Sequence, residues 1–244
     1  MNHPSRKCQV HFLGLISYQQ AWDLQAQLAE EIAAGDRSPT LLLLEHPHTY
    51  TFGRSGHRKN LLWDQAEREQ RGIQLFDVDR GGDITYHGPG QLVGYPLLPL
   101  GVADADGHLP GPDYLAYLRQ LEQVLIDALK EYGIGGQRVE GLTGVWVHEE
   151  TASNNQKLAK IAAIGVKVDV HGVSRHGFAL NVSPDMSYWQ GIVPCGLADS
   201  HVASMTQWLS PAPPVEDVAQ TVAAHFGRIF AVELVWRHLS QIAT

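Results

Sequence analysis

Apolar residues recur every three or four positions in three stretches of the chain, which is the spacing of an amphipathic helix. The first stretch follows an S-x-x-Q capping sequence at Ser17 and ends at Gly35, a residue type that commonly terminates helices. The second runs from Asp113 to Gly133, and the third from about Val215 to Phe230 after a proline-rich entry. We expect a helix in each stretch.

Short apolar runs rich in β-branched residues separate these helices and predict strands. The predicted strands are Leu41 to Leu44, Ile73 to Val78, Val145 to Val147, Ile161 to Val170, Phe178 to Val182 and Val232 to Val235. Residues 101–113 and 148–157 are rich in Gly, Asp, Pro, Asn and Glu, which predicts loops. The order of elements predicts a single α/β (α+β) domain over residues 1–244, with a mixed β-sheet flanked by helices.

The segment from Arg80 to Pro96 has an unusual composition. It holds five glycines and two prolines around Arg80, Tyr86 and His87. Glycine lets backbone N–H groups approach a bound group closely, so we interpret the segment as a backbone cradle rather than a packed element. An ordinary turn between strands is the simpler alternative, and the density of glycine counts against it.

The glycines of this cradle do not have the spacing of a nucleotide site. Gly88, Gly90 and Gly94 form G-x-G-x-x-x-G, one residue longer than the dinucleotide pattern, and the sequence has no G-x-x-x-x-G-K-[ST] loop. The sequence therefore predicts neither an NAD site nor an ATP site.

Composition narrows the function further. The net charge of −8, without a basic stripe, argues against general nucleic-acid binding. The thirteen histidines occur in neither H-E-x-x-H nor zinc-finger spacing, so we expect no metal site. With no long apolar run and no signal-like start, we expect a cytoplasmic protein. The sequence has two cysteines, Cys195 and Cys8, and Cys8 lies in an N-terminal stretch that we expect to be irregular. Because the cytoplasm is reducing, we expect both to be free thiols.

The predicted strand after Lys160 has two distinct faces. Counting in twos places Lys160 on the buried side with Ala162 and Ile164, provided that the strand has no bulge, and leaves Lys167 and Asp169 on the solvated side. Partial burial disfavours a charged amine and makes the neutral form available for proton transfer. Alternatively, Lys160 only flanks the strand and extends its amine into water.

Cys195 lies between Pro194 and Gly196, an arrangement that holds a thiol in a tight turn and leaves room beside the sulfur. Such a thiol becomes a nucleophile when a partner takes its proton or stabilises its thiolate, and Lys160, His87 and His176 are the candidates. The alternative is an inert cysteine that serves as a small core residue.

Four blocks of the sequence carry a family resemblance. They are Arg80 to Gln91, Lys160 to Gly165, His176 to Asn181 and Pro194 to Gly196. Together they resemble the lipoyl(octanoyl) transferases, the octanoyl-[acyl-carrier-protein]:protein N-octanoyltransferases of lipoate biosynthesis, from about residue 40 to about residue 208. The resemblance implies a fold like the catalytic domain of biotin and lipoate protein ligases, and a cysteine/lysine dyad that needs no metal, nucleotide or other cofactor.

The same resemblance implies roles for individual residues. Cys195 would be the acyl-accepting nucleophile and Lys160 its acid/base partner, because Lys160 directly precedes Ile-Ala-Ala-Ile-Gly; Lys157 is the alternative lysine. The implied contacts with the acyl substrate are Arg80, Gly81, Gly82, Asp83, Ile84, Thr85, Tyr86, His87, Ala163, Ile164, Gly165, Gly177, Phe178 and Ala179. Backbone N–H groups of the cradle or of a turn at 163–165 are candidates for stabilising the oxyanion.

The eight-carbon chain would need an apolar channel. Leu92, Val93, Tyr95 and Phe178 are candidates to line it, and each could equally be a core residue.

The implied donor is octanoyl-acyl carrier protein. The implied acceptors are lipoyl domains of 2-oxoacid dehydrogenase complexes and the glycine-cleavage H protein, and we expect a monomer without nucleic-acid or membrane partners. Since such protein partners are acidic, we expect a local basic patch. Its expected members are Arg54, Arg58, Lys59, Arg80 and Arg175.

Three features depart from the family pattern, namely Asp83 inside the cradle, the insert near 101–112 and the polar loop 148–157. We expect the two insertions to affect partner docking rather than chemistry. Two other functions are compatible with the fold. An ATP-dependent lipoate or biotin ligase needs no nucleophilic cysteine, and a non-catalytic scaffold needs neither Lys160 nor Cys195.

Overall fold

The computed structural model of the chain describes residues 6–101, 114–150, 156–194 and 201–237. Its helices are α1 (Tyr18–Ala34), η1 (Arg58–Asn60), α2 (Gln65–Gln70), α3 (Tyr114–Glu131), η2 (Met186–Gly191), η4 (Met205–Gln207) and α4 (Val215–Ile229). Its strands are β1 (Arg6–Leu15), β2 (Thr40–Glu45), β3 (Thr49–Phe52), β4 (Gln74–Asp77), β5 (Ile84–His87), β6 (Gln91–Leu97), β7 (Gln137–Val139), β8 (Leu142–Glu150), β9 (Gln156–Val168), β10 (Ser174–Asn181), β11 (His201–Val202) and β12 (Val232–Trp236).

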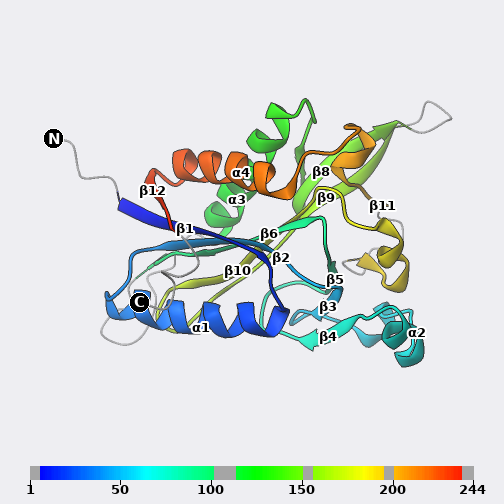
Figure 1. Cartoon of the computed structure of the whole chain (residues 1–244), viewed down its shortest axis with the longest axis horizontal. Coiled ribbons are helices and arrows are strands. Elements are labelled where there is room, and N and C mark those ends of the chain that lie inside the picture. Colours follow the sequence, from blue (N-terminus) through cyan, green and yellow to red (C-terminus); the bar gives the residue numbers. More distant parts are fainter. Residues whose placement is uncertain (1–5, 102–113, 151–155, 195–200, 238–244) are drawn as a thin grey trace.

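The described strands form one large mixed sheet and one small sheet (Figure 1). The large sheet has the order β12-β1-β2-β6-β10-β9-β8-β7, with β11 paired to β9. The strands β12, β1 and β2 are parallel to one another. From β2 onward in this order, each pair of neighbouring strands is antiparallel, and β11 runs parallel to β9. The small sheet has the order β4-β3-β5. The expected mixed sheet flanked by helices is confirmed.

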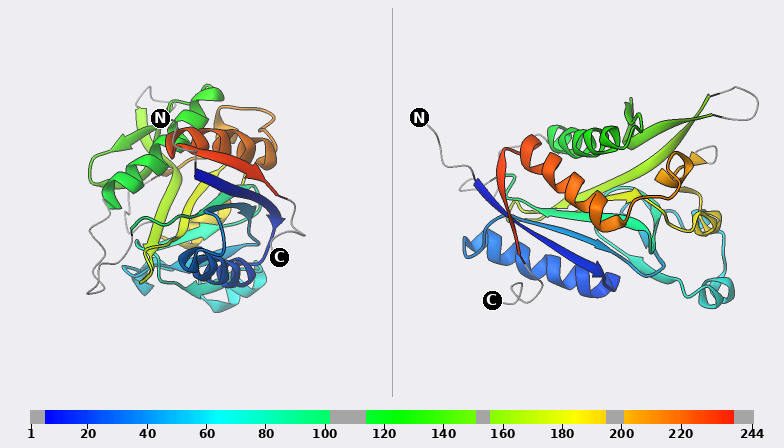
Figure 2. Two further views of the ribbon diagram at one scale, coloured as in Figure 1. Left: turned by 90° about the vertical axis from the view of Figure 1, so that its left-hand side faces the viewer. Right: turned by 45° about the horizontal axis from the view of Figure 1, so that its top comes forward.

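Helices cover both faces of the large sheet, with α3 and α4 on one side and α1 on the other (Figures 1 and 2). This explains the uninterrupted apolar run of β2, since a strand buried on both faces needs no polar alternation. Leu41 and Leu43 pack on the α3/α4 side, and Leu42 and Leu44 pack on the α1 side.

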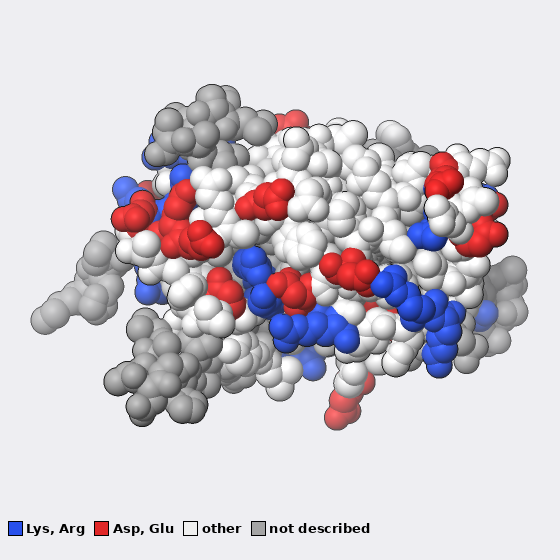
Figure 3. Space-filling model, turned by 90° about the horizontal axis from the view of Figure 1, so that it is seen from below, with Lys and Arg blue, Asp and Glu red and all other residues white. Residues whose placement is uncertain are grey.

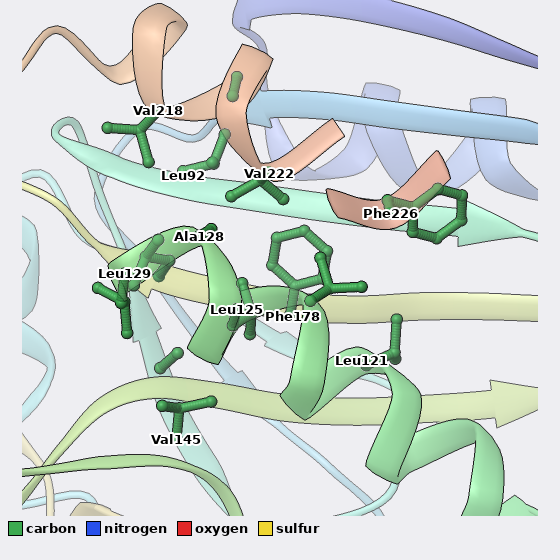
Figure 4. Packing of buried hydrophobic residues seen from close by; sticks show 14 of the residues in the cluster. Leu92, Leu121, Leu125, Ala128, Leu129, Val145, Phe178, Val218, Val222 and Phe226 are labelled. Carbon is green, nitrogen blue, oxygen red and sulfur yellow. The ribbon is translucent and has the colours of Figure 1, made fainter. Parts of the chain in front are cut away.

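The layer between α3, α4 and the sheet is the larger apolar core. Leu121 and Leu125 of α3 and Phe226 of α4 meet Leu92 and Phe178 of the sheet (Figure 4). All five side chains are at most 2% exposed. The helical spacing of leucine in α3 therefore reflects burial against the sheet.

The three predicted helices are confirmed within the described residues. The Ser17 side chain accepts a hydrogen bond from the Gln20 backbone N–H, and Gly35 ends α1 with φ at 84°. This positive φ suits glycine, because it lacks a Cβ that would clash. The six predicted strands are also confirmed as parts of β2, β4, β8, β9, β10 and β12.

The N-terminal stretch differs from the prediction. Residues 6–15 form β1, which pairs with both β2 and β12, and Cys8 is fully buried in the large core. Burial raises the pKa of the Cys8 thiol to about 12, so it stays protonated at neutral pH. The expected irregular segment is in fact an inner strand of the sheet.

The cradle interpretation of residues 80–96 is wrong in part. Residues 84–87 and 91–97 form the buried strands β5 and β6. Gly90, with φ at 84°, turns the chain between them, and a Cβ there would lie 2.4 Å from the Ser183 carbonyl oxygen. Packed strands thus account for most of the segment, and only residues 80–83 form an irregular loop.

The loop prediction at 148–157 is also partly wrong, because β8 continues to Glu150 and β9 begins at Gln156. The rest of this prediction, at 151–155, and the predicted loop at 102–113 lie outside the described residues.

Candidate active site

A cavity of about 680 Å³ lies beside the small sheet, on the face of the large sheet that carries α1. The loop 80–83 and β5 form one wall, and β9 and β10 form another. Tyr18 at the start of α1 and Tyr95 of β6 also line it. The cavity therefore opens where α1 stops covering the sheet.

The cavity brings together the predicted substrate-binding residues from three separate segments of the sequence. All of them line it except Tyr86, together with Lys160. Tyr86 lies in the apolar cluster of the small sheet, where its hydroxyl group and His48 Nδ1 are 2.9 Å apart. Alternation along β5 places the side chains of Thr85 and His87 on the opposite face of the strand from Tyr86.

Close backbone packing shapes the loop 80–83. A Cβ on Gly53 would lie 2.3 Å from the Gly82 carbonyl oxygen, and one on Gly165 would lie 3.0 Å from the Gly81 carbonyl oxygen. The loop is thus held between two glycines. The buried Arg80 guanidinium fixes it further, donating to the Thr51 carbonyl oxygen at 2.7 Å and to its hydroxyl at 2.8 Å.

Asp83 has a structural role. Its Oδ1 accepts the backbone N–H groups of His57 at 3.0 Å and Ile84 at 2.6 Å, and its Oδ2 accepts the Asn60 side chain. Asp83 thereby connects the loop 80–83 to residues 53–60, several of which line the cavity. Sequence reasoning did not identify His57 and Asn60, because their role depends on this distant carboxylate.

Lys160 faces the cavity for a reason other than the one predicted. In the pairing of β8 with β9, Trp146 is opposite Lys160 but Val145 is opposite Ala162, so Ile161 is an extra residue. Such a bulge reverses the alternation of side chains. Ile161 and Ala162 consequently both pack in the large core, whereas Lys160 lines the cavity. The assumption of an unbulged strand was wrong.

The other lysines of this strand lie elsewhere. Lys157 is exposed, and its Nζ lies 3.5 Å from His201 Nε2. Lys167, expected on a solvated face, instead forms an ion pair with Asp79. Of these three lysines, Lys160 is the one that lines the cavity.

Cys195 and the segment 195–200 lie outside the described residues. The chain leading to Cys195 is described as far as Pro194. Pro194 and Lys160 border the same small pocket, together with Thr85, Gln91 and Trp189. Thr85, Lys160, Ala163 and Ala179 border the large cavity as well.

Two buried histidines line the cavity in fixed orientations. His87 Nδ1 donates to Gln91 Oε1 at 2.8 Å, and His176 Nε2 donates to Asp79 Oδ1 at 2.7 Å. Burial lowers the pKa of both rings, in His87 well below its usual range, and Asp79 partly opposes the effect at His176. The His176 backbone has φ at 57°, and its backbone N–H donates to Gln25 Oε1 of α1 at 2.7 Å. Gln25 thus fixes the backbone of His176, and the Asp79 carboxylate fixes its ring.

Asp79 is the centre of an ion-pair network behind the loop 80–83. It accepts hydrogen bonds from His176, Lys167 and Arg175, which together hold the pKa of its carboxyl group below the usual value. The network connects β9 and β10 to the residue before Arg80. It thereby fixes one end of the cavity wall.

The expected basic patch is only partly present. Arg80 is buried, Arg175 is paired with Asp79, and Arg58 makes a bidentate contact with Asp77 at 2.6 and 2.7 Å. Figure 3 shows Lys and Arg in separate groups with Asp and Glu between them on the α1 side of the molecule. Lys59 is the exposed cation of the five that lines the cavity.

Other expectations also changed. All four residues expected to line an acyl channel belong to the apolar cores, and of these Tyr95 and Phe178 also border the cavity, whereas Leu92 and Val93 do not. Residues 163–165 lie in β9 paired with β10 rather than in a turn.

The described residues contain no group of three or more His, Cys, Asp or Glu side chains arranged to hold a metal ion. No helix among them is both long and apolar enough to cross a membrane.

Comparison with known proteins agrees with this geometry. Residues 17–227 match the family described as the lipoyl protein ligase A/B catalytic domain. Among solved structures, the bi-partite lipoate protein ligase of Thermoplasma acidophilum superposes with a TM-score of 0.72 at 15% identity, covering 97% of this chain and 88% of the ligase. A lipoate-protein ligase A bound with ATP gives 0.70 at 14% identity, covering 97% and 90%. At these identities the similarity concerns the fold alone.

Sequence relatives define the activity more closely. An octanoyltransferase of Chloroflexus aurantiacus is 46% identical over 228 residues, covering 93% of this chain and 96% of the relative. An octanoyltransferase of Solibacter usitatus is 47% identical over 230 residues, covering 94% and 96%. The chain belongs to the lipoyl protein ligase A/B catalytic domain family and, within it, to the lipoyl(octanoyl) transferases, which are acyltransferases.

Proposed function

We propose that this chain transfers an octanoyl group from octanoyl-acyl carrier protein to a lysine of a lipoyl domain, through an acyl-enzyme on Cys195 with Lys160 as its acid/base partner. The observation that carries the proposal is the small pocket shared by Lys160 and Pro194, since Pro194 is the residue before Cys195. The neighbouring cavity has room for an acyl chain, and Tyr95, Ala163 and Ala179 are among the residues that line it.

The first half of the reaction exchanges one thioester for another. The Cys195 thiolate attacks the octanoyl carbonyl carbon, a new C–S bond forms, and the bond to the phosphopantetheine sulfur breaks. The Lys160 ammonium group gives a proton to the departing thiolate and becomes a neutral amine. The octanoyl group is then held on Cys195 as a thioester.

The second half forms the amide. The acceptor lysine attacks the acyl-enzyme carbonyl carbon, a C–N bond forms and the bond to Cys195 Sγ breaks. Neutral Lys160 accepts the proton that the attacking amine loses, which restores the thiolate and ammonium pair. Replacement of a thioester by an amide draws the sequence forward.

The proposed acceptors are the lipoyl domains of 2-oxoacid dehydrogenase complexes and the glycine-cleavage H protein, and the product is the first intermediate of endogenous protein lipoylation. The acyl group arrives on the carrier's phosphopantetheine, so the proposal includes no cofactor. We propose that the enzyme acts as a monomer in the cytoplasm.

The test is intact-protein mass measurement after incubation with octanoyl-acyl carrier protein in the absence of ATP. We expect one octanoyl group on the wild type and no stable thioester on Cys195→Ser. Cys8→Ala is the matched control, because Cys8 is buried in β1, and it should acylate as the wild type does. Octanoyl retained on Cys195→Ala overturns the assignment of the nucleophile.

The same measurement separates the proposal from an ATP-dependent ligase of the same fold. A ligase forms no octanoyl adduct from the carrier protein and modifies the lipoyl domain only when ATP and free octanoate are supplied. That outcome would overturn the transferase proposal.

A further inference from the structure

Trp146 of β8 lies directly opposite Lys160 of β9 in the sheet. The Lys160 Nζ lies 4.8 Å from the centroid of the indole ring. The two residues are only 2% and 9% exposed. A cation within about 6 Å of an indole ring is attracted to it, and the attraction increases when water is excluded.

Core packing alone does not account for a tryptophan at this position. Val145 and Val147, its neighbours in β8, pack in the large apolar core, whereas Trp146 contacts the lysine that faces the cavity. Its Nε1 is buried without a hydrogen-bond partner among the described residues. An unsatisfied buried N–H group destabilises the fold, and a phenylalanine or leucine would avoid that cost.

Gly144 allows the close approach of β8 and β9 that sets this contact. A Cβ on Gly144 would lie 2.6 Å from the Ala162 carbonyl oxygen and 3.5 Å from Lys160 Cε. The Gly144 N–H donates to Glu122 Oε1 of α3 at 3.1 Å, and Glu122 is fully buried. The bulge at Ile161 and the position of Lys160 are therefore anchored to the core.

We propose that Trp146 is a positioning residue, whose indole face holds the Lys160 ammonium group at the cavity wall and stabilises its protonated form. The proposal rests on the proposed function, in which that ammonium group donates a proton in the first half of the reaction.

Other titratable and charged groups share the cavity with Lys160, and their titration has to be separated from its own. They are Tyr18, His57, Lys59, Arg80, Asp83, His87, Tyr95 and His176.

The contact is tested first without reference to activity. In protein labelled with ¹³C-lysine, the Lys160 methylene signals are identified by their absence from Lys160→Arg. Protons over an aromatic face resonate upfield, so we expect an upfield Lys160 signal in the wild type and in Trp146→Phe. In Trp146→Leu we expect that signal at the position of an ordinary lysine.

The consequence for catalysis is tested by the pH profile of the acylation half, measured in a single turnover by mass. Loss of the indole face should move the alkaline limb of Trp146→Leu to lower pH by about one unit. Trp146→Phe should lie between the wild type and Trp146→Leu, because phenylalanine presents a weaker aromatic face to the cation. Val147→Ala is the matched control, because it removes core packing from the same strand and should lower stability without moving the limb.

The outcomes separate this inference from the proposed function. An ordinary Lys160 signal in the wild type, or an unmoved limb in a folded Trp146→Leu protein, overturns the role of Trp146. Full acylation and transfer by Lys160→Ala overturns the proposed role of Lys160, and the role of Trp146 in catalysis falls with it. An upfield signal, a moved limb and an inactive Lys160→Ala protein together support both.

Discussion

The two faces of β9 and β10 are built from the same strands and serve opposite purposes. Toward α3 and α4, Phe178, Ile161 and Leu180 pack in an apolar layer whose side chains are almost fully buried. On the other face, Gly165, Gly177 and their neighbours border a cavity with polar side chains in its walls. One face has gained stability from filling space, and the other has kept space open for a substrate.

Small residues make this difference possible. A Cβ on Gly177 would lie 2.1 Å from the Gly94 carbonyl oxygen, and one on Gly165 would meet Arg80 and Gly81. The cavity side therefore depends on close backbone contacts, whereas the core side depends on the volume of its side chains. Changes on the two sides should consequently have different signatures.

The largest expected effect is a loss of catalytic rate, without a loss of stability, in a variant of Lys160 on the cavity side. Lys160→Arg keeps a positive charge but does not give up a proton near neutral pH, so acylation should survive in part while transfer to the lipoyl domain falls about 10²- to 10⁴-fold. Single-turnover measurement of each half checks this. Lys157→Ala and Lys167→Ala are the controls, and loss of transfer in Lys157→Ala with normal rates in Lys160→Arg would contradict the assignment.

Phe226→Ala should have the opposite effect, a loss of stability without a loss of catalytic rate. Phe226 of α4 is fully buried in the layer opposite the cavity, so its truncation should lower the free energy of unfolding by about 3–5 kcal/mol. Chemical denaturation gives this value, and the acylation rate at a temperature where the variant is folded should match the wild type. A lower rate in the folded variant would mean that the two faces are coupled.

Asp79→Asn tests the network behind the cavity wall. Since its ion-pair partners hold the pKa of Asp79 below the usual value, its contribution to stability is fully present above about pH 4 and is lost gradually as the pH falls from there through the lowered pKa of the folded state. We expect Asp79→Asn to lower the free energy of unfolding by about 1–2 kcal/mol at pH 7, and by less at pH 3. A difference that is independent of pH would argue against an ionic role.

The smallest expected effect is at the cavity mouth. Arg58→Glu combined with Lys59→Glu should raise KM for the protein substrates severalfold at low salt, while acyl transfer from a small octanoyl thioester changes little. Steady-state kinetics at two salt concentrations checks this. Equal losses with both donors would place these side chains against the acyl group.

Local patterns predicted the parts of the fold that depend on local sequence. The leucine spacing of α3 and the apolar run at Leu41 to Leu44 each predicted their element. The strand β1 was missed because His11 and Gln9 interrupt its apolar pattern, although the His11 side chain is itself buried. Burial of such a polar residue depends on the rest of the sheet.

In the candidate site, too, some features could be predicted from the sequence and others depend on the pairing of distant strands. The family resemblance predicted the cavity-lining residues around Arg80, Gly165 and Gly177, because the matching sequence blocks include these positions. The bulge at Ile161 was not predictable, since it arises from the pairing with Val145 and Trp146 of another strand. Lys160 was thus correctly assigned to the cavity on a parity argument that does not hold.

Because of the hydrogen bonds between residues 53–60 and the loop 80–83, this part of the cavity wall becomes ordered when the protein folds rather than when a substrate binds. The Arg54 and Ser55 N–H groups donate to the carbonyl oxygens of Arg80 and Gly82 at 2.9 and 3.1 Å, and Asp83 holds His57. The chain entropy lost in fixing this rim is therefore lost during folding, before any donor arrives. An acyl chain then enters a cavity whose wall is already formed, and the free energy of its binding does not include the cost of ordering this part of the protein chain.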